Sequence, residues 1–260
     1  MRITVIGGTG LVGTKLVGLL GGKGHDVVVA ARATGVNSYT GEGLEEALSG
    51  ADVVIDVSNS SYTDEAAARE FFYASTLNLL TFGDAAGVGH HVALSVVGTD
   101  RLARAQGGYF IAKEQQERLL MASGRPFSIV HGTQFFEFIR SITDAAMRSG
   151  VARVADVLIQ PMAADDVAMA VADVALGSPL YGVREYAGPE VFELGEVSRQ
   201  DLRFRHDDRE VGPDPLGTYF GARLARRDLL PEATATIAPT RFHDWRVQFP
   251  VAGWPVGHHR

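Results

Sequence analysis

The chain has no cysteine among its 260 residues, only three lysines, and fewer basic than acidic side chains, 24 against 31. Without cysteine, disulfides, thiol catalysis and cysteine-ligated metals are excluded, and a reducing compartment is compatible. A net charge of −7 leaves little counterion release to drive binding to nucleic acid. No apolar run reaches the length of a membrane span, and the N-terminus lacks the pattern of a secretory signal. We therefore expect a cytoplasmic protein without nucleic-acid or membrane partners.

Short apolar runs alternate with helical patterns over residues 1–190. Such continuous runs are typical of parallel strands that are buried on both faces of a sheet. Because helical crossovers between parallel strands have one hand, the pattern predicts a doubly wound α/β sheet. The predicted strands are 2–6, 26–30, 53–57, 92–96 and 127–131, and the predicted helices among them are 11–20, 43–48 and 63–80.

The C-terminal part has a different pattern, because prolines interrupt the apolar alternation beyond residue 190. We therefore divide the chain into a sheet-forming domain, 1–190, and a smaller region, 191–260, packed beside the sheet. Two helices are predicted in the smaller region, at 194–202 and 217–224. Its aromatic residues are expected to line a pocket or an interface; they are Tyr219, Phe220, Phe242, Trp245 and Trp254.

The first predicted strand runs directly into the glycine-rich segment 7–13, and a helical pattern follows at once. This G-x-x-G-x-x-G spacing between strand and helix is typical of a loop that binds the pyrophosphate of a dinucleotide. Gly7 permits the tight turn, Gly10 lets the backbone approach the phosphates, and Gly13 lets the helix pack closely. The candidate cofactor-binding residues of this segment are Gly7, Thr9, Gly10, Leu11, Val12 and Gly13. The alternative is an ordinary glycine-rich turn.

The end of the second predicted strand indicates which dinucleotide binds. An NAD site places a carboxylate there, about 20 residues past the glycines, to bind the ribose 2′-hydroxyl. This chain has no acid at that place, and Arg32 follows the strand, where a guanidinium accommodates a 2′-phosphate. Thr34 and Gly35 offer a hydroxyl and a backbone donor. We therefore expect NADP(H) on a Rossmann unit; the alternative for Arg32 is a surface arginine without a ligand.

Tyr109 and Lys113 are four residues apart near the start of a predicted helix, so their side chains share one helix face. A nearby ammonium and a cationic nicotinamide ring favour the phenolate, which lowers the pKa of such a tyrosine toward neutral. The tyrosine then exchanges a proton with a carbonyl or alcohol oxygen while hydride moves, and Lys113 also binds the nicotinamide ribose. By composition alone, about 0.08 chance matches to this spacing are expected. A surface helix with an amphipathic lysine is the alternative.

Other polar residues follow predicted strands at their carboxyl ends, where ligands bind in a doubly wound sheet. Ser58 and Asn59 are candidates for the cofactor path, although a plain polar loop explains them equally well. His131 either acts on the substrate or is a hydrogen-bonded core histidine. Gln134 and Phe135 begin the next helix over the expected substrate pocket.

No metal site is expected from the sequence. His90 and His91 precede a predicted strand on the side away from the chemistry, and no further ligands follow at a regular spacing. Asp165 and Asp166 are better explained as residues at a helix start, where they cap the helix and its dipole stabilises them.

The glycine loop, Arg32 and the Tyr109–Lys113 pair together resemble the short-chain dehydrogenase/reductase superfamily, and most closely its atypical NmrA-like branch of NAD(P)-binding proteins. Supporting segments are 51–57, 94–98, 126–138 and 159–168. The resemblance spans nearly the whole chain and is strongest over 1–190. It implies an NAD(P)-binding Rossmann domain at 1–190 and a C-terminal region at 191–260 on the substrate side.

The chain departs from the superfamily pattern at one catalytic position. Active members carry a serine or threonine that binds the substrate oxygen, and alignment of segment 94–98 places Val96 there. Ser95 is one position away, and adjacent residues on a strand point to opposite faces. Ser95 is therefore an auxiliary catalytic candidate only if the strand has already ended.

Together these patterns predict an NADP(H)-dependent oxidoreductase that transfers hydride to a carbonyl- or quinone-like small molecule, with Tyr109 as the proton donor. Two alternatives remain open. One is a redox sensor that binds NADP(H) and a partner protein without turnover; Val96 favours it, and the retention of Tyr109 with Lys113 opposes it. The other is an epimerase or dehydratase that recycles its cofactor. A homo-oligomer is compatible with each of them.

Overall fold

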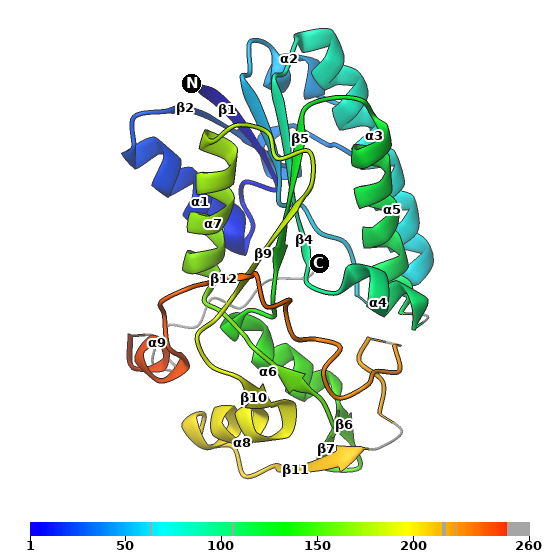
Figure 1. Ribbon diagram of the computed structural model, residues 1–260, viewed down its shortest axis with the longest axis vertical. Coiled ribbons are helices and arrows are strands. Elements are labelled where there is room, and N and C mark those ends of the chain that lie inside the picture. Colours follow the sequence, from blue (N-terminus) through cyan, green and yellow to red (C-terminus); the bar gives the residue numbers. More distant parts are fainter. Residues whose placement is uncertain (63, 106, 215–216, 221, 249–260) are drawn as a thin grey trace.

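A computed structural model describes residues 1–62, 64–105, 107–214, 217–220 and 222–248. At its centre is a seven-stranded sheet in which all neighbouring strands are parallel (Figure 1). The strand order is β12-β9-β5-β4-β3-β1-β2. The bounds are β1 Arg2–Ile6, β2 Asp26–Ala30, β3 Val53–Asp56, β4 His90–Val96, β5 Phe127–Gly132, β9 Val183–Ala187 and β12 Thr236–Ile237. The predicted doubly wound parallel sheet is confirmed.

Helices cover both faces of this sheet, as Figure 1 shows. On one face lie α1, Leu11–Gly22, and α7, Ala164–Leu176; on the other lie α3, Glu65–Ala86, and α5, Gly108–Ala122. Shorter elements at its rim are η1 Arg32–Thr34, α2 Leu44–Leu48 and α4 Thr99–Arg104. Consecutive Val53 and Val54 pack into cores on opposite faces. Burial on both sides explains why the strands have continuous apolar sequences.

Two predicted boundaries on the α3 and β4 segments differ from the structure. The Asp64 carboxylate caps the start of α3 by accepting a hydrogen bond from the Ala67 N–H at 3.0 Å, and Gly87, with φ 73°, ends the helix. The prediction ended this helix six residues too early because the sequence remains compatible with helix up to Gly87. β4 begins at His90, so His90 and His91 lie inside the strand and not before it.

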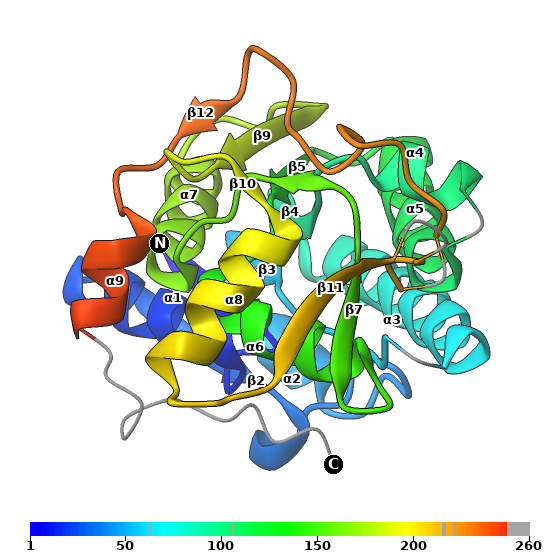
Figure 2. The ribbon, with the colours of Figure 1, turned by 90° about the horizontal axis from the view of Figure 1, so that it is seen from below.

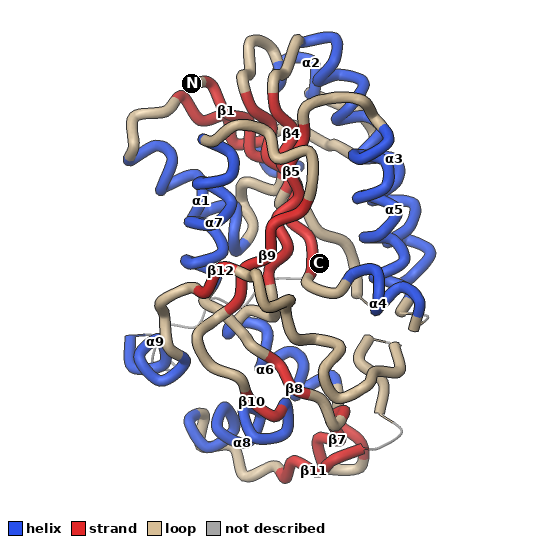
Figure 3. The backbone as a smooth tube through the Cα atoms, in the orientation of Figure 1, coloured by secondary structure: helices blue, strands red, loops and turns tan. Residues whose placement is uncertain are grey.

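A second group of elements lies below the carboxyl ends of the strands, and Figures 2 and 3 show it from two sides. It consists of α6 Phe136–Ala145, β6 Met147–Arg148, β7 Val151–Ala155, β8 Leu158–Ile159, β10 Phe192–Glu193, α8 Leu194–Phe204, β11 Glu210–Asp214 and α9 Phe242–Gln248. The division after residue 190 stays a prediction. In space the two groups of elements do not follow this division, because α6 to β8, before residue 190, lie in the lower group, and β12, after it, pairs with β9 of the sheet.

The C-terminal segments match the sequence predictions only in part. The helix predicted at 194–202 is confirmed as α8, whereas the described residues of 217–224 form no helix. Phe220 has a φ of 47°, which interrupts any regular helix, and Tyr219 pairs with Ala222 as an isolated antiparallel bridge. Tyr219, Phe242 and Trp245 are buried among other rings, and Trp254 lies outside the described residues.

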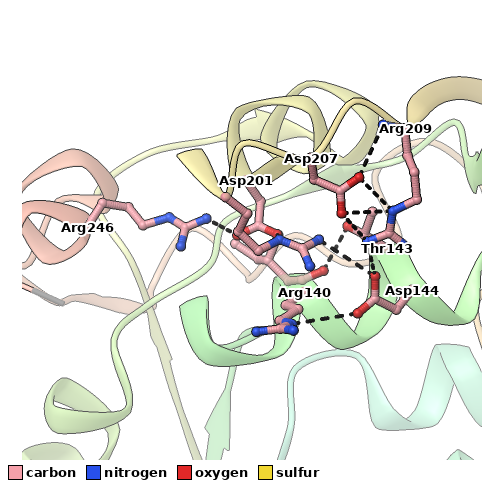
Figure 4. Close-up of polar contacts among 9 residues, drawn as sticks. Arg140, Thr143, Asp144, Asp201, Asp207, Arg209 and Arg246 are labelled. Carbon is pink, nitrogen blue, oxygen red and sulfur yellow. Dashed lines mark hydrogen bonds and ion pairs between the residues drawn. The ribbon is translucent and has the colours of Figure 1, made fainter. Parts of the chain in front are cut away.

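A buried group of charged side chains joins the helices of the lower part (Figure 4). Asp201 on α8 is fully buried, and its carboxylate forms ion pairs with Arg205 at 2.8 Å and with Arg246 on α9. Asp144 on α6 pairs with Arg209 at 2.7 Å and with Arg205 at 3.6 Å. Asp201 and Asp144 therefore connect three helices that are far apart in the sequence.

Candidate active site

The glycine loop after β1 has the geometry that its sequence predicts. Gly7 has a φ of 77°, and its N–H donates to the Ala30 carbonyl at 2.9 Å, which turns the chain sharply after the strand. A Cβ atom on Gly7 would lie 2.8 Å from the backbone of Ser58. Thr9 and Gly10 are exposed. The loop therefore offers backbone to a ligand at the carboxyl edge of the sheet.

Gly13 brings helix α1 into direct contact with this loop. A Cβ atom there would lie 2.1 Å from the Gly7 carbonyl oxygen and 2.8 Å from the Gly8 Cα. Gly10 is the N-cap residue of α1 and adds no side-chain cap, and the first turn contains no acid. The helix N-terminus therefore keeps unsatisfied N–H groups and a positive dipole end, an arrangement suited to a phosphate.

We expect Gly13→Ala to cost about 1–3 kcal/mol of stability, because the new methyl group overlaps the loop backbone. If the loop binds a nicotinamide dinucleotide, its affinity should fall as well, by about tenfold, since α1 must move away from the loop. Gly18→Ala on the same helix is the matched control, because no atom lies within 4 Å of its added Cβ. That control should stabilise the protein slightly. Thermal denaturation and titration with NADH and NADPH measure both effects, and equal behaviour of the two variants would contradict the role given to Gly13.

Arg32 lies directly beyond the end of β2, as the sequence predicts. It begins the turn η1 and is exposed, and among the described residues its guanidinium has no ion pair or hydrogen bond. Thr34 differs from expectation, because its hydroxyl already donates to the Val29 carbonyl at 2.8 Å and accepts from the Ala31 N–H at 3.0 Å. The guanidinium of Arg32 is therefore the group of this turn that is available to an anion.

Tyr109 lies in the first turn of α5 and is 5% exposed. Its hydroxyl donates to Asn59 Oδ1 at 2.7 Å, and its ring centroid is 4.5 Å from that of Tyr62. Burial, with the neighbouring Tyr62, raises the pKa of Tyr109 well above its ordinary value. The chain's own side chains therefore favour the protonated phenol, opposite to the lowered pKa that the sequence predicts. A protonated phenol is the form that a proton donor requires.

Lys113 does not direct its ammonium toward the Tyr109 hydroxyl. It is 2% exposed, and its Nζ donates to the Leu94 carbonyl at 2.8 Å and to the Gln116 amide oxygen. Burial lowers the pKa of Lys113 to about 8, although the charge of Asp56 opposes this shift. The Gln116 amide nitrogen in turn donates a hydrogen bond to Asp56 Oδ2 at 2.9 Å. Lys113 thus belongs to a buried polar group beneath the site, and its contact with a ribose stays a prediction.

Asp56 links this buried group to the loop that follows β3. Its Oδ1 accepts from the Ser58 N–H at 2.9 Å and from the Ser58 hydroxyl at 2.6 Å. The loop then presents Asn59 to Tyr109. The carboxylate of Asp56 therefore fixes the segment that carries two of the predicted cofactor-binding residues.

Ser95 and His131 meet in a second cluster, centred on Glu117 of α5. Both residues hydrogen-bond the Glu117 carboxylate, His131 through Nε2 at 2.9 Å, and His131 Nδ1 lies 3.6 Å from Glu185. Burial opposes protonation of His131, but its interactions with Glu117 and Glu185 outweigh this and raise its pKa to about 8. Glu117 and Glu185 were missed by sequence reasoning. The position of Glu117, four residues after Lys113, was the available signal.

β4 continues through Val96, so the condition for Ser95 to replace the usual serine is not met. The Ser95 hydroxyl faces Glu117 and Thr99. Val96 is partly buried and packs against the apolar cluster that includes Tyr109. An auxiliary catalytic part for Ser95 therefore has no geometric support beyond its place on β4.

Gln134 and Phe135 lie between β5 and α6, where the sequence predicts them. Gln134 is 6% exposed, and its amide lowers the pKa of the nearby Tyr219 against the larger raising effect of burial. The Phe135 ring contacts Phe138 at 5.7 Å between centroids, and Phe138 contacts Tyr62 at 5.6 Å. Aromatic rings from three separate segments thus gather around Tyr109.

No three histidine, aspartate or glutamate side chains within the described ranges come together as metal ligands. Nor does any helix in those ranges have the length and apolarity that crossing a bilayer requires. Asp165 and Asp166 lie in the first turn of α7, as the sequence predicts, but the N-cap residue is Ala163, and Asp166 accepts a hydrogen bond from the Thr240 N–H at 3.2 Å.

Residues 3–125 match the sequence profile of a family described as the NAD dependent epimerase/dehydratase family. The N-terminal half of the chain thus resembles an NAD-dependent enzyme domain. The photosystem II assembly factor Ycf39 of Synechocystis sp. is 32% identical over 111 residues, which are 37% of this chain and 34% of that protein. The match thus spans about a third of the curated relative's length. Neither comparison names the NmrA-like branch, which stays a prediction.

Solved structures with the same fold include sugar-nucleotide enzymes. A dTDP-4-dehydrorhamnose reductase, an RfbD orthologue from Clostridium acetobutylicum, is similar with a TM-score of 0.75 and 16% identity over 95% of this chain and 98% of that one. MoeE5 in complex with UDP-glucose and NAD has a TM-score of 0.68 and 17% identity over 94% and 91%. The Bacillus anthracis dTDP-4-dehydrorhamnose reductase in complex with NADP has a TM-score of 0.65 and 16% identity, over 91% of this chain and 89% of that one. At these identities the likeness shows the fold alone.

Proposed function

We propose that this chain is an NADP(H)-dependent oxidoreductase that reduces a carbonyl- or quinone-like small molecule, with Tyr109 as the proton donor. The observation that carries the proposal is the position of a protonated, buried tyrosine at the same sheet edge as the glycine loop. Ligands of doubly wound sheets bind at this edge. The match of residues 3–125 to an NAD-dependent family supports a nicotinamide cofactor.

In this proposal the glycine loop and the N-terminus of α1 bind the diphosphate of the cofactor, and Arg32 binds its 2′-phosphate. The reduced nicotinamide, when bound, supplies hydride to the carbonyl carbon of the substrate. Tyr109 donates its hydroxyl proton to the substrate oxygen as negative charge develops there. Lys113 stays in the buried polar group beneath the site, where its ammonium donates to the Leu94 carbonyl and the Gln116 amide oxygen. The rings of Tyr62, Phe138 and Phe220 exclude water from this region.

Oxidation of NADPH by the purified chain, with menadione and benzaldehyde as probes, tests the proposal. We expect absorbance of NADPH to fall only when a probe is present. NADPH binding without oxidation by any member of a broad carbonyl and quinone panel would contradict the proposal and favour the redox sensor.

Arg32→Glu is expected to weaken NADPH binding by roughly 10–100-fold, because one charge-assisted contact with the 2′-phosphate is worth about 1.5–3 kcal/mol. Binding of NADH should change little. The matched control is Arg118→Glu, which makes the same charge change at an exposed arginine of α5. Fluorescence titration with both cofactors gives the preference, and an unchanged NADPH/NADH ratio would contradict NADP(H) specificity.

The second candidate is an epimerase or dehydratase that recycles its cofactor. The match of residues 3–125 to the NAD dependent epimerase/dehydratase family favours it. Such an enzyme keeps its cofactor through a complete reaction cycle. Nicotinamide dinucleotide that stays bound through purification, with no net NADPH oxidation, would support this candidate over the reductase.

A further inference from the structure

Gln134 carries a buried side-chain amide whose hydrogen-bonding groups are unsatisfied. The residue is 6% exposed, and among the described residues neither Oε1 nor Nε2 has a hydrogen-bond partner. Gln116 shows the contrasting case, because it is 1% exposed but its amide accepts from Lys113 and donates to Asp56 at 2.9 Å. A buried donor and acceptor without partners cost free energy, which a ligand that supplies both partners recovers.

The backbone around Gln134 is fixed at the carboxyl edge of the sheet. The Gln134 carbonyl accepts from the Met162 N–H at 2.9 Å, and the Met162 carbonyl accepts from the Phe136 N–H at 2.9 Å. Phe135, between them, forms a parallel bridge with Met162, which is fully buried. The unsatisfied amide is therefore carried by a backbone that its hydrogen bonds hold in place.

The Gln134 amide lies in the same site as Tyr109. It is near the Tyr219 hydroxyl, whose pKa it lowers, although the two groups form no hydrogen bond. The Tyr219 ring is stacked on Phe110 with centroids 6.2 Å apart, and Phe110 contacts the Tyr109 ring at 5.4 Å. Two ring contacts thus connect the neighbour of Gln134 to the proposed proton donor.

The strand order indicates which part of a dinucleotide reaches Gln134. In the proposed function Arg32, after β2, binds the 2′-phosphate, and the glycine loop, after β1, binds the diphosphate. β5 lies three strands beyond β1 on the side away from β2. At about 4.8 Å per strand, the end of β5 is about 14 Å from the glycine loop. The end of the cofactor opposite the 2′-phosphate, which carries the nicotinamide, extends toward this edge.

We propose that Gln134 binds the carboxamide of the nicotinamide through two hydrogen bonds. Nε2 donates to the carboxamide oxygen, and Oε1 accepts from the carboxamide nitrogen, so one ligand group satisfies both unpaired atoms. The inference rests on the cofactor binding of the proposed function. Because the carboxamide stands on one edge of the ring, Gln134 also fixes the rotation of the ring and the face that it turns to the substrate.

Gln134→Leu tests this assignment, because leucine fills a similar space without polar atoms. The probes are NADP⁺ and its 3-acetylpyridine analogue, in which a methyl group replaces the carboxamide NH₂. In wild type the analogue should bind about tenfold more weakly than NADP⁺, because Oε1 stays unpaired. In Gln134→Leu, Kd for NADP⁺ should rise about tenfold and the preference over the analogue should disappear. 2′-Phospho-ADP-ribose, which lacks the nicotinamide, should bind both proteins equally.

Thermal denaturation separates a binding role of Gln134 from a structural one. Without nucleotide, Gln134→Leu should keep or raise Tm, because it removes an unsatisfied amide. Gln116→Leu is the matched control, because it removes a buried amide that has its partners, and its Tm should fall by about 5 °C. Added NADP⁺ should raise Tm less in Gln134→Leu than in wild type.

An equal preference for NADP⁺ over the analogue in wild type and Gln134→Leu would overturn the proposal. A loss of Tm in Gln134→Leu as large as in Gln116→Leu would also overturn it. NAD⁺ carries the same carboxamide, so NAD⁺ and its acetylpyridine analogue decide the role of Gln134 even where Arg32 does not select NADP⁺. A wild type that binds NADP⁺ but oxidises NADPH with no probe would reject the reductase alone, whereas one that binds neither dinucleotide would reject both proposals.

Discussion

Tyr109→Phe is expected to lower kcat for reduction of menadione by about 10²–10⁴-fold, the usual contribution of a positioned general acid. Phenylalanine preserves the ring contacts with Tyr62, Phe72 and Phe110, so the packing around α5 should survive. Only the proton that the substrate oxygen requires is lost. Kd for NADPH should therefore stay within about twofold of wild type. Steady-state kinetics and NADPH titration on the same preparation measure the two quantities.

Tyr219→Phe is the matched control for this experiment. Tyr219 is also a buried phenol, and its ring is stacked on Phe110 with centroids 6.2 Å apart, but its hydroxyl faces Gln134. We expect a much smaller loss of kcat in this variant. If Tyr109→Phe reduced menadione as fast as wild type, Tyr109 would be excluded as the acid. Equal losses in both variants would point to packing as the cause.

Asp201→Ala is expected to lower the free energy of unfolding by about 3–5 kcal/mol, because it removes the carboxylate from between two buried guanidinium groups. The side chains of Arg205 and Arg246 are only 7% and 4% exposed, so water replaces the lost carboxylate poorly. The expected change in Tm is about −10 °C for a chain of this size. Chemical and thermal denaturation measure it.

An exposed ion pair gives the control for Asp201. Asp156 contacts Arg226 at 2.6 Å, with exposed fractions of 60% and 47%. Because solvent and salt screen such a pair, Asp156→Ala should cost less than about 1 kcal/mol. A loss of stability in Asp201→Ala no larger than in Asp156→Ala would show that the buried network contributes little.

The elements that sequence patterns predicted well are those whose burial follows from local sequence. β2 was predicted with its observed bounds because an apolar run stands between a turn and the polar segment after it. The glycine loop was equally local, since its turn and its contact with α1 arise within seven residues. The missing helix near Phe220 shows the opposite case. The Phe220 ring packs against Tyr62 and Tyr219, and these tertiary contacts are not visible in the helix propensity of the local sequence.

The candidate site divides in the same way. Position and spacing in the sequence identified Asn59, Tyr109 and Lys113 as candidates. Their contacts, however, depend on where the loop after β3 meets α5. The same spacing that aligns Lys113 with Tyr109 also aligns it with Glu117, and burial beside Asp56 decided which neighbours the ammonium contacts. Sequence spacing thus located the helix face but not the partners of its side chains.

The pairing of β12 with β9 bears on how the chain folds during synthesis. Thr236 and Ile237 lie beside Tyr186 and Ala187 at the edge of the sheet, although about 50 residues of the lower group separate them in sequence. A ribosome releases the N-terminal strands first, and β9 then presents an uncovered edge, which is prone to pair with other chains. Protection of that edge must wait until residue 237 has emerged. The nascent chain therefore passes through a period in which its sheet is nearly complete and still open to aggregation.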